Sequence, residues 1–301
     1  MTTVGPSDDL SLPDPTRAAD QIVAFIKRTF TEQDKHTAVI GVSGGIDSAT
    51  SLTLACRALG PAQVVAVTMP DGDQPTADAQ SVLEFNAVSA AHRLTINIKP
   101  MVDSTVRQLP DPPDRYRRGN IAARCRMMVL YDTALARRAL VCGTENKSEY
   151  YLGYFTRYGD EASDLEPIVH LWKTQVSLLA EHLGLPERIR AKPPSADLWT
   201  NQTDQQELGF SYRQADPILA ALERYLNDNQ LDTRQLAEGP AVRQAFIDHW
   251  QGKSRQQGQP ERKQPGPDRP STALVSSVVA RIAAQDFKHR VPYRLTAADD
   301  D

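Results

Sequence analysis

The sequence lacks the features that would tie it to a membrane, to secretion or to a disulfide framework. Among its 301 residues no apolar run approaches the length that crosses a bilayer. The N-terminus has neither the basic start nor the apolar core of a secretory signal. The three cysteines, Cys56, Cys125 and Cys142, are far apart and lack CxxC spacing, which disfavours both a disulfide framework and a zinc site. We therefore expect a cytoplasmic protein.

The sequence also lacks an excess of charge of one sign. Its 34 Lys and Arg stand against 38 Asp and Glu, a formal net charge of -4. This balance gives no footprint for general binding to nucleic acid or to a membrane surface, and we expect neither partner. With 40% hydrophobic and 24% charged residues, the composition is that of a globular protein of one large domain or two small ones.

Apolar runs of strand length alternate with helical patterns in the first half of the chain. The runs are rich in β-branched residues, and most do not alternate with polar residues, which is typical of strands covered on both faces. They are Ala38–Val42, Val64–Met69, Leu94–Ile98 and Ala139–Gly143. The helical patterns are Pro15–Phe30, Ala49–Leu59, Ala77–Ala91 and Ile121–Arg138. This order predicts an α/β fold with a doubly wound, open parallel sheet.

From His170 onward the chain turns helical, and we expect these helices to pack against or beside the sheet. The predicted helices are Leu171–Leu183, Pro217–Asn227, Ala241–Trp250 and Thr272–Phe287. Two segments fit no element. Residues 1–13 are expected to be a flexible tail. Residues 251–270 contain no residue of the hydrophobic set and four of the 21 prolines, and they are either a disordered connector or a mobile lid over an anionic ligand.

A Gly-rich loop, GVSGGIDSAT (Gly41–Thr50), follows the first strand and opens a helix. It is neither a Walker A loop nor a dinucleotide GxGxxG motif. Gly44 and Gly45 allow a tight turn that presents N–H groups to an anion, and a helix N-terminus favours negative charge. Ser43 and Ser48 add hydroxyl donors. Because Asp47 would repel bound phosphates unless a cation intervenes, the loop suggests Mg²⁺ as the cofactor.

The SGGIDS loop resembles the pyrophosphate loop of the N-type ATP pyrophosphatases, which have the Rossmann-like fold of the adenine nucleotide alpha hydrolases. Five further segments resemble, in order and spacing, the ammonia-dependent NAD⁺ synthetases of that superfamily. They are GNIAARCRM (Gly119–Met127), GTENKSE (Gly143–Glu149), GYFTRYGDEASDLEPI (Gly153–Ile168), LWKTQV (Leu171–Val176) and KPPSADLWTNQTDQQELG (Lys192–Gly209). The resemblance implies one synthetase domain over 14–301, a homodimer, and the ATP-dependent amidation of deamido-NAD⁺ by ammonia through an adenylated carboxylate, with release of AMP and pyrophosphate.

The resemblance also assigns residues to ATP and metal. It implies Mg²⁺ on Asp47 and Glu149, although Glu149 alone is equally an exposed helix carboxylate. It makes Asp47 and Lys173 the catalytic pair, with Lys173 on the departing phosphates, where an ordinary helix lysine would be solvated. Thr144 could otherwise be a helix cap and Ser195 a turn residue. The implied ATP-binding set is Gly41, Val42, Ser43, Gly44, Gly45, Ile46, Asp47, Ser48, Thr144, Lys173 and Ser195.

For deamido-NAD⁺ the resemblance implies contacts from Arg124, Arg157, Asp164, Phe287 and Lys288. Two of these depart from the family pattern, which has Lys at the position of Arg157 and His at that of Phe287. We expect Arg126, two residues beyond Arg124 on a helix, to point elsewhere.

The cysteines are expected to be small buried hydrophobes rather than nucleophiles. Because a glutamine-using synthetase needs an amidotransferase with its own nucleophile, and the length leaves no room for one, the sequence points to ammonia. Two alternatives stay open. One is another adenylating amidase or tRNA-modifying enzyme of the superfamily, and the other is a nucleotide-binding regulator without turnover.

Overall fold

The computed structural model describes residues 10–199, 201–252 and 270–291. These residues divide into two compact units. The first, which we call the sheet unit, comprises Leu10–Tyr150 and Phe155–Tyr212. The second, the helical unit, comprises Tyr151–Tyr154 and the described residues from Arg213 onward. The expectation of one domain over 14–301 stays a prediction.

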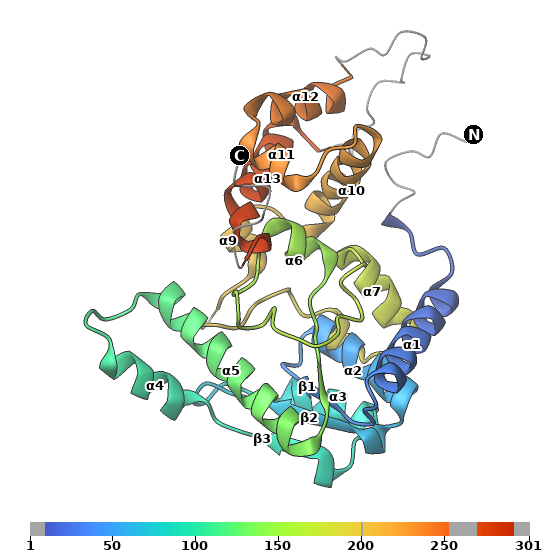
Figure 1. Ribbon diagram of the computed structural model, residues 1–301, viewed down its shortest axis with the longest axis vertical. Coiled ribbons are helices and arrows are strands. Elements are labelled where there is room, and N and C mark those ends of the chain that lie inside the picture. Colours follow the sequence, from blue (N-terminus) through green and yellow to red (C-terminus); the bar gives the residue numbers. More distant parts are fainter. Residues whose placement is uncertain (1–9, 200, 253–269, 292–301) are drawn as a thin grey trace, which may run out of the picture. The chain divides into compact units, whose positions relative to one another are not determined.

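The sheet unit is built on four parallel strands in the order β3-β2-β1-β4 (Figure 1). The strands are β1 (Ala38–Gly41), β2 (Val64–Thr68), β3 (Arg93–Thr95) and β4 (Leu140–Cys142). The chain runs outward from β1 to β3 and then returns to place β4 on the other side of β1. Ligands bind where the strand order reverses in this way, outside the carboxyl ends of the strands. The expected site therefore lies at the ends of β1 and β4.

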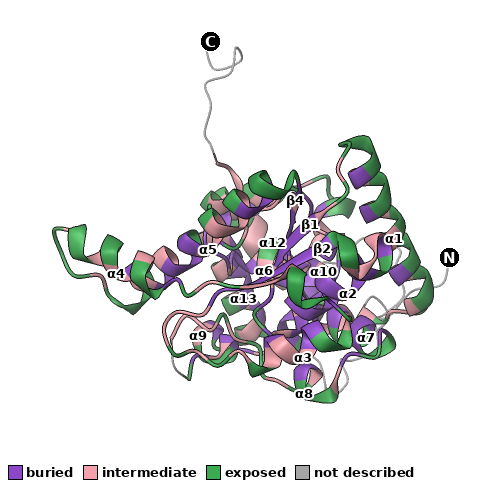
Figure 2. Cartoon of the chain, turned by 90° about the horizontal axis from the view of Figure 1, so that it is seen from below, coloured by how far each residue is buried: buried purple, intermediate pink, exposed green. Residues whose placement is uncertain are grey.

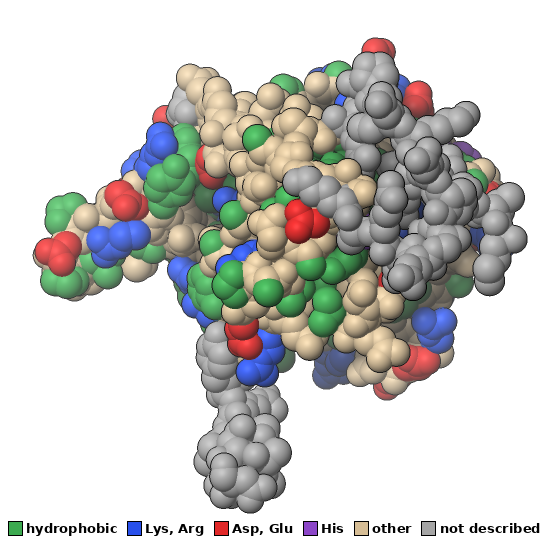
Figure 3. Space-filling view, turned by 90° about the horizontal axis from the view of Figure 1, so that it is seen from above, with side chains coloured by type: hydrophobic (Ala, Val, Ile, Leu, Met, Phe, Trp, Pro, Cys, Tyr) green, Lys and Arg blue, Asp and Glu red, His purple; other side chains and the backbone are tan. Residues whose placement is uncertain are grey.

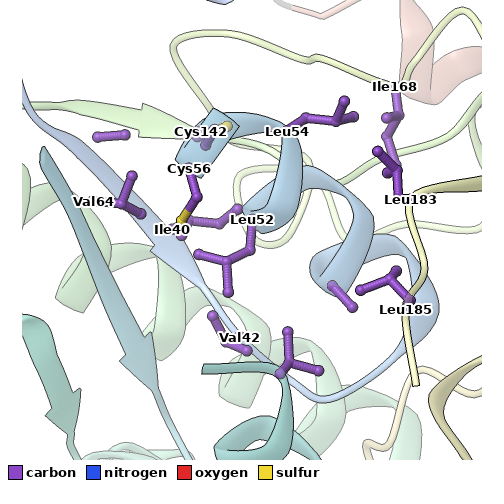
Figure 4. Close-up of a cluster of buried hydrophobic side chains, with 14 of the residues drawn as sticks. Ile40, Val42, Leu52, Leu54, Cys56, Val64, Cys142, Ile168, Leu183 and Leu185 are labelled. Carbon is purple, nitrogen blue, oxygen red and sulfur yellow. The ribbon is translucent and has the colours of Figure 1, made fainter. Parts of the chain in front are cut away.

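Helices cover both faces of this sheet, which confirms the doubly wound fold. Side chains alternate along β1, so that Ala38 and Ile40 join the hydrophobic cluster on one face and Val39 joins the cluster on the other. Figure 4 shows Ile40 of β1 with Leu52, Leu54 and Cys56 of α2 in the first cluster. That cluster includes side chains from the helices α1 (Pro15–Glu32), α2 (Ile46–Leu59), α3 (Ala77–Phe85), α7 (Lys173–His182) and α8 (Glu187–Arg190). The other contains α4 (Lys99–Gln108) and α5 (Arg115–Arg137).

Burial explains how the sequence forms these helices. The buried residues of α1 recur every three or four positions and form one face, and the opposite face is exposed (Figure 2). In contrast, α2 is buried almost along its length, because it lies between the sheet and the helices α1 and α7. It ends at Leu59 and is capped by Gly60, whose positive φ of 84° glycine adopts readily.

Several predicted elements have different bounds in the structure. The helix expected over Ala77–Ala91 ends at Phe85, because Asn86 caps it by donating a side-chain hydrogen bond to the Val82 carbonyl and Ala87 adopts a φ of 53°. The third strand covers Arg93–Thr95 rather than Leu94–Ile98. Residues 96–98 lead directly into α4, with Ile98 as its N-cap, and the sequence analysis did not predict this helix.

The helical unit has its own apolar core. It contains most of α10 (Tyr212–Asp228), together with α11 (Thr233–Glu238), α12 (Pro240–Trp250), α13 (Thr272–Gln285) and the short η4 (Asp286–His289). Leu236, Phe246 and Val278 are fully buried, and the Tyr225 and Phe246 ring centroids are 5.4 Å apart. The ring of Trp250 packs next to Phe246.

The two segments predicted to be flexible fall mainly outside the described residues. Of the tail over 1–13, the part from Leu10 is described, and there Leu12 packs against the sheet-unit core. Of the segment 251–270, Gln251, Gly252 and Pro270 are described. Trp250 donates its ring N–H to the Pro270 carbonyl at 3.4 Å, which brings the two ends of the segment together.

Among the described helices none is long and apolar enough to cross a bilayer. On the face shown in Figure 3, Lys and Arg side chains lie among Asp and Glu side chains.

Candidate active site

The loop between β1 and α2 forms a cradle for an anion. Ser43 and Ser48 lie side by side, with their hydroxyl oxygens 3.1 Å apart, and the Gly45 N–H donates to the Ser43 hydroxyl. Helix α2 begins at Ile46 with no side-chain cap at Gly45, so its first N–H groups face the loop without a capping acceptor. These are the donors that a phosphate group takes at a helix N-terminus.

Gly44 is required by the packing of this loop. Its φ is 81°, which L side chains rarely adopt. A Cβ at this position would lie 2.6 Å from the Cβ of Asp78 and 2.7 Å from the backbone nitrogen of Ala79, at the start of α3. The loop can therefore approach α3 this closely only with glycine at position 44.

Three charged side chains meet at the end of the loop. The Lys173 ammonium donates to Asp47 Oδ2 at 2.6 Å and to Glu149 Oε1 at 2.7 Å. Their side chains are 6%, 18% and 17% exposed, in that order. Asp47 comes from the first turn of α2, Glu149 from α6 (Lys147–Leu152) and Lys173 from the first turn of α7. Asp47, Glu149 and Lys173, hereafter the charged triad, were each predicted from the sequence, and the structure brings them together.

Local hydrogen bonds explain the positions of these three residues. The Asn146 amide donates to Asp47 Oδ1, while Asn146 Oδ1 accepts from the backbone N–H of Glu149, so this one side chain links the Asp47 carboxylate to the first turn of α6. The Ser148 hydroxyl accepts from the Lys173 N–H at 2.8 Å. Asn146 and Ser148 lie within the GTENKSE segment but were not predicted as site residues, because Asn and Ser before a helix are ordinary capping residues.

Burial and charge act in opposite directions on the triad. Burial alone would lower the pKa of Lys173, but the Asp47 and Glu149 carboxylates raise it above its ordinary value. Burial raises the pKa of Glu149, and the Lys173 ammonium opposes that rise. Lys173 is therefore charged, and it neutralises part of the negative charge of the two carboxylates.

The two carboxylates suit a hard divalent cation. Asp47 Oδ2 and Glu149 Oε1 converge on one point, the Lys173 nitrogen, and carboxylate oxygens are the ligands that Mg²⁺ prefers. Across the described part of the chain, no cluster of three or more His, Cys, Asp or Glu side chains could hold a metal ion. A bound Mg²⁺ would therefore complete its shell with phosphate oxygens and water, as it commonly does.

Two residues that the sequence analysis missed support Lys173 from the other side. The Lys173 ammonium lies 5.1 Å from the centre of the Tyr212 ring, a cation–π contact. The Tyr212 hydroxyl donates to Asp204 Oδ2 at 3.0 Å, and the Asp204 N–H donates to the Pro194 carbonyl. Tyr212 and Asp204 are 6% and 2% exposed. Asp204 lies within the Lys192–Gly209 segment that resembles the family, but it was not singled out there, and no motif covers Tyr212.

The other predicted ATP residues lie on loops at the same edge of the sheet. Thr144 is half-buried, two residues beyond β4. The Ser195 hydroxyl accepts from the Asp197 N–H, and the Asp197 carbonyl accepts from the Gln74 amide at 2.6 Å. Among the described residues no hydrogen bond joins Thr144 or Ser195 to the charged triad, so their part in binding stays a prediction.

Among the predicted dinucleotide residues, Arg124 and Arg157 lie together, since the Arg124 guanidinium donates to the Arg157 carbonyl at 3.2 Å. Asp164 lies beside β4, where its carboxylate accepts a hydrogen bond from the Val141 N–H at 2.7 Å. As expected, Arg126 points elsewhere, to the Met69 carbonyl beyond β2. In the helical unit, Lys288 donates to the Gly153 carbonyl at 2.6 Å.

Phe287 is 44% exposed within the helical unit. Binding of the dinucleotide by Arg124, Arg157, Asp164, Phe287 and Lys288 stays a prediction.

The cysteines are buried, as expected. All three are free thiols in the core. Burial raises the pKa of the Cys56 thiol to about 12 and also raises the pKa values of Cys125 and Cys142. Since the thiolate is the nucleophile, none of them is suited to that role.

Comparisons with known protein sequences point to one family. The NAD synthase family model matches residues 18–259. The chain is 39% identical to an NH(3)-dependent NAD(+) synthetase of Thermococcus kodakarensis, over 83% of this chain and 96% of that protein. It is 43% identical to an NH(3)-dependent NAD(+) synthetase of Trichlorobacter lovleyi, over 75% of this chain and 81% of that one.

Solved structures of an NAD synthetase and of an NMN synthetase are also similar to this chain. An NH3-dependent NAD synthetase from Campylobacter jejuni matches with a TM-score of 0.69 and 29% identity, over 94% of this chain and 99% of that one. An NMN synthetase from Francisella tularensis matches with a TM-score of 0.67 and 28% identity, over 94% and 98%. The extent of the family match and the identity to these relatives show that the chain belongs to the NAD synthase family.

Proposed function

We propose that this protein is a ligase that amidates deamido-NAD⁺ with ammonia, at the expense of ATP, to give NAD⁺, AMP and pyrophosphate. The observation that carries the proposal is the convergence of Asp47, Glu149 and Lys173 beside a loop that can cradle phosphates. The names of the relatives supply ammonia and the product NAD(+), and the family resemblance implies ATP and deamido-NAD⁺.

Chemistry explains why such a site suits this reaction. A free carboxylate is a poor acyl donor, because its leaving group would be oxide. When the nicotinate carboxylate attacks the ATP α-phosphorus, pyrophosphate leaves and an acyl-adenylate forms. Ammonia then attacks the acyl carbon, and AMP leaves.

This chain's residues would act mainly through position and charge. The loop from Gly41 to Ser48 would hold the phosphates with its N–H groups and the hydroxyls of Ser43 and Ser48. Asp47 and Glu149 would hold Mg²⁺, which supplies charge neutralisation at the phosphates when it is bound. Lys173 would move from the carboxylates toward the phosphates and stabilise the charge that develops on pyrophosphate.

The remaining assignments belong to the same proposal. Thr144 and Ser195 would contact ATP, whereas Arg124, Arg157, Asp164, Phe287 and Lys288 would contact the dinucleotide. The enzyme would work as a cytoplasmic homodimer.

A product assay tests the proposal. The purified protein is incubated with Mg²⁺ and ATP, with deamido-NAD⁺ or its mononucleotide counterpart, and with ammonium or glutamine, and the formation of NAD⁺ or NMN, AMP and pyrophosphate is followed. We expect NAD⁺ from deamido-NAD⁺ and ammonium, with little product from glutamine. Preference for the mononucleotide would make the protein an NMN synthetase instead, and absence of any amidated product would refute the proposal.

The matched variant for this assay is Asp47→Asn. The amide keeps the shape of the side chain but removes a metal ligand and a charge. We expect it to abolish pyrophosphate release while its circular dichroism spectrum stays that of a folded protein. Turnover like that of the wild type would remove the proposed role of Asp47.

A further inference from the structure

A second pair of carboxylates, Glu145 and Glu166, lies at the end of β4 and has no part in the chemistry above. Glu145 follows Thr144 on the segment that leaves β4. Glu166 lies on a segment that runs parallel to β4, where the Gly143 N–H donates to the Leu165 carbonyl at 2.8 Å. Both carboxylates therefore lie at the sheet edge where the active site is built.

The Glu166 carboxylate is fixed in place. The Ser163 hydroxyl donates to its Oε1 at 2.6 Å, and the Glu145 N–H donates to its Oε2 at 3.1 Å. It packs directly on the backbone of Gly143, where a Cβ would overlap the carboxylate group. The sequence therefore provides a glycine, a hydroxyl and an N–H group that together hold this one acidic side chain.

Glu145 lacks such partners. The residue is only 8% exposed, and its Oε1 is buried with no hydrogen-bond partner among the described residues. The neighbouring charges that act on it most strongly are carboxylates: Glu166, Glu149, Asp160 and Glu161. Burial and then these neighbours raise the pKa of Glu145 to about 9, and burial raises that of Glu166 to about 7.

A buried carboxylate without a counter-charge is costly, so such a pair takes up either a proton or a cation. A divalent ion is a poor fit, since Mg²⁺ demands octahedral geometry and keeps several waters, which a buried pair of carboxylates does not accommodate. An ammonium ion fits better, because it carries one positive charge and N–H donors for acceptors such as the buried Glu145 Oε1.

We propose that Glu145 and Glu166 form a binding site for the ammonium ion from which the enzyme takes its ammonia. This inference rests on the proposed function and deepens it. Glu145 directly precedes Asn146, whose side chain bonds both Asp47 Oδ1 and the Glu149 N–H, so the bound ion would lie close to the carboxylates proposed to hold Mg²⁺. Potassium, which has the same charge and a similar size but no N–H donors, is the competing occupant.

The kinetic test uses Glu145→Gln and Glu166→Gln, with Glu84→Gln as control. Glu84 is an exposed residue of α3, so its variant removes one negative charge without touching the pair. We expect each variant of the pair to raise the KM for ammonium about tenfold or more, as loss of a charge-assisted hydrogen bond does, while the KM for ATP changes little. The control should leave all constants unchanged. An ammonium KM within about twofold of wild type in both folded variants would overturn the proposal.

A second nucleophile separates ammonium capture from a general loss of structure. Hydroxylamine is a weaker base than ammonia and is uncharged at neutral pH, so it does not need a cation site. We expect Glu145→Gln to keep most of its activity with hydroxylamine, measured as hydroxamate. Equal losses with both nucleophiles would show that Glu145 acts only through the fold.

Direct binding gives a readout that does not depend on turnover. Thallium(I), a monovalent cation visible by NMR, is titrated into the enzyme as its nitrate in chloride-free buffer and then displaced with ammonium nitrate or potassium nitrate. We expect thallium binding that ammonium displaces better than potassium and that Glu145→Gln abolishes. No binding, or equal binding in the variant, would mean that the pair shares a proton instead, and stronger displacement by potassium would make it a potassium site. If the enzyme made no NAD⁺ but bound thallium in this way, the proposed function would fail and the cation site would stand.

Discussion

Lys173 holds together two carboxylates that would repel each other without it. Its ammonium lies within 2.7 Å of an oxygen of each, and all three side chains are largely buried. Replacing Lys173 with Met should therefore leave Asp47 and Glu149 close together without a counter-charge. Removing one member of a buried ion pair costs about 3–5 kcal/mol.

We expect this loss of stability to depend on Mg²⁺. In chemical denaturation without a divalent cation, Lys173→Met should unfold at a lower denaturant concentration than the wild type. Millimolar Mg²⁺ should recover part of the difference, because the ion replaces the lost positive charge. An identical loss with and without Mg²⁺ would contradict a metal site on these carboxylates.

Tyr212 offers a test of how Lys173 is positioned. Phe keeps the ring beneath the ammonium and loses only the hydroxyl that donates to Asp204, whereas Leu loses both. Since a desolvated cation–π contact contributes about 1–2 kcal/mol, we expect Tyr212→Leu to lower kcat about tenfold. Tyr212→Phe should retain most of the activity, and its pH profile should match that of the wild type. Equal kcat values for the two variants would show that the ring face has no role in positioning Lys173.

At this scale the sequence could identify the charged triad but not its supports. Asp47, Glu149 and Lys173 occur in motifs whose chemistry is unusual enough to recognise. Asn146, Tyr212 and Asp204 become visible only when the segment before α6 and the first turns of α9 (Asp204–Leu208) and α10 are placed together, because each residue is common in its own local context. The pair of Glu145 and Glu166 was missed for the same reason.

The local sequence pattern predicts the strands and helices of the sheet unit more completely than it predicts the residues of the site. Each predicted strand was found, since β-branched apolar runs buried on both faces have few other uses. The misplaced ends have local causes, such as the left-handed Ala87 after α3. Helix α4 was not predicted because its apolar face is short and Val102 is its buried residue.

The close packing of the loop between β1 and α2 against the start of α3 can be tested by substituting Gly44. Gly44→Ala introduces both a strained φ and an overlap with the start of α3, whereas Gly184→Ala introduces only the strained φ, since nothing lies within 4 Å of a Cβ there. We expect Gly44→Ala to lower the free energy of unfolding by about 1–3 kcal/mol more than Gly184→Ala does. Thermal melting of the two variants measures this difference, and similar melting temperatures would show that the loop can move away from α3.

The buried carboxylates of Glu145 and Glu166, at the end of β4, should make the stability of the folded protein depend on pH. The folded-state pKa values of Glu166 and Glu145, about 7 and about 9, lie above the ordinary value of 4.5. Between these limits the folded state binds more protons than the unfolded state, so its stability falls as pH rises. Each group can contribute a slope of up to about 1.4 kcal/mol per pH unit.

Glu145→Gln removes one of these titrating groups. We expect the free energy of unfolding to fall less steeply between pH 5 and 9 in this variant than in the wild type, in buffers without ammonium or potassium. Parallel pH profiles would show that Glu145 does not titrate in that range in the folded protein.

For the whole molecule, the two units differ in how much the sequence explained. The sheet unit contains the charged triad and the phosphate loop, and these lie beyond the carboxyl ends of β1 and β4, the neighbouring strands at which the strand order reverses. The helical unit has no comparable motif, because its helices were predicted from apolar spacing alone, and spacing does not say which faces meet. Its two predicted ligand residues, Phe287 and Lys288, rest on the family pattern.

The central claim is that the molecule activates a carboxylate by adenylation. Deamido-NAD⁺ labelled with oxygen-18 in its nicotinate carboxylate tests this most directly. When the enzyme turns over with ATP and ammonium, mass spectrometry should find a single labelled oxygen in the phosphate of AMP and none in pyrophosphate. AMP without label, from turnover that still yields NAD⁺, would contradict the account.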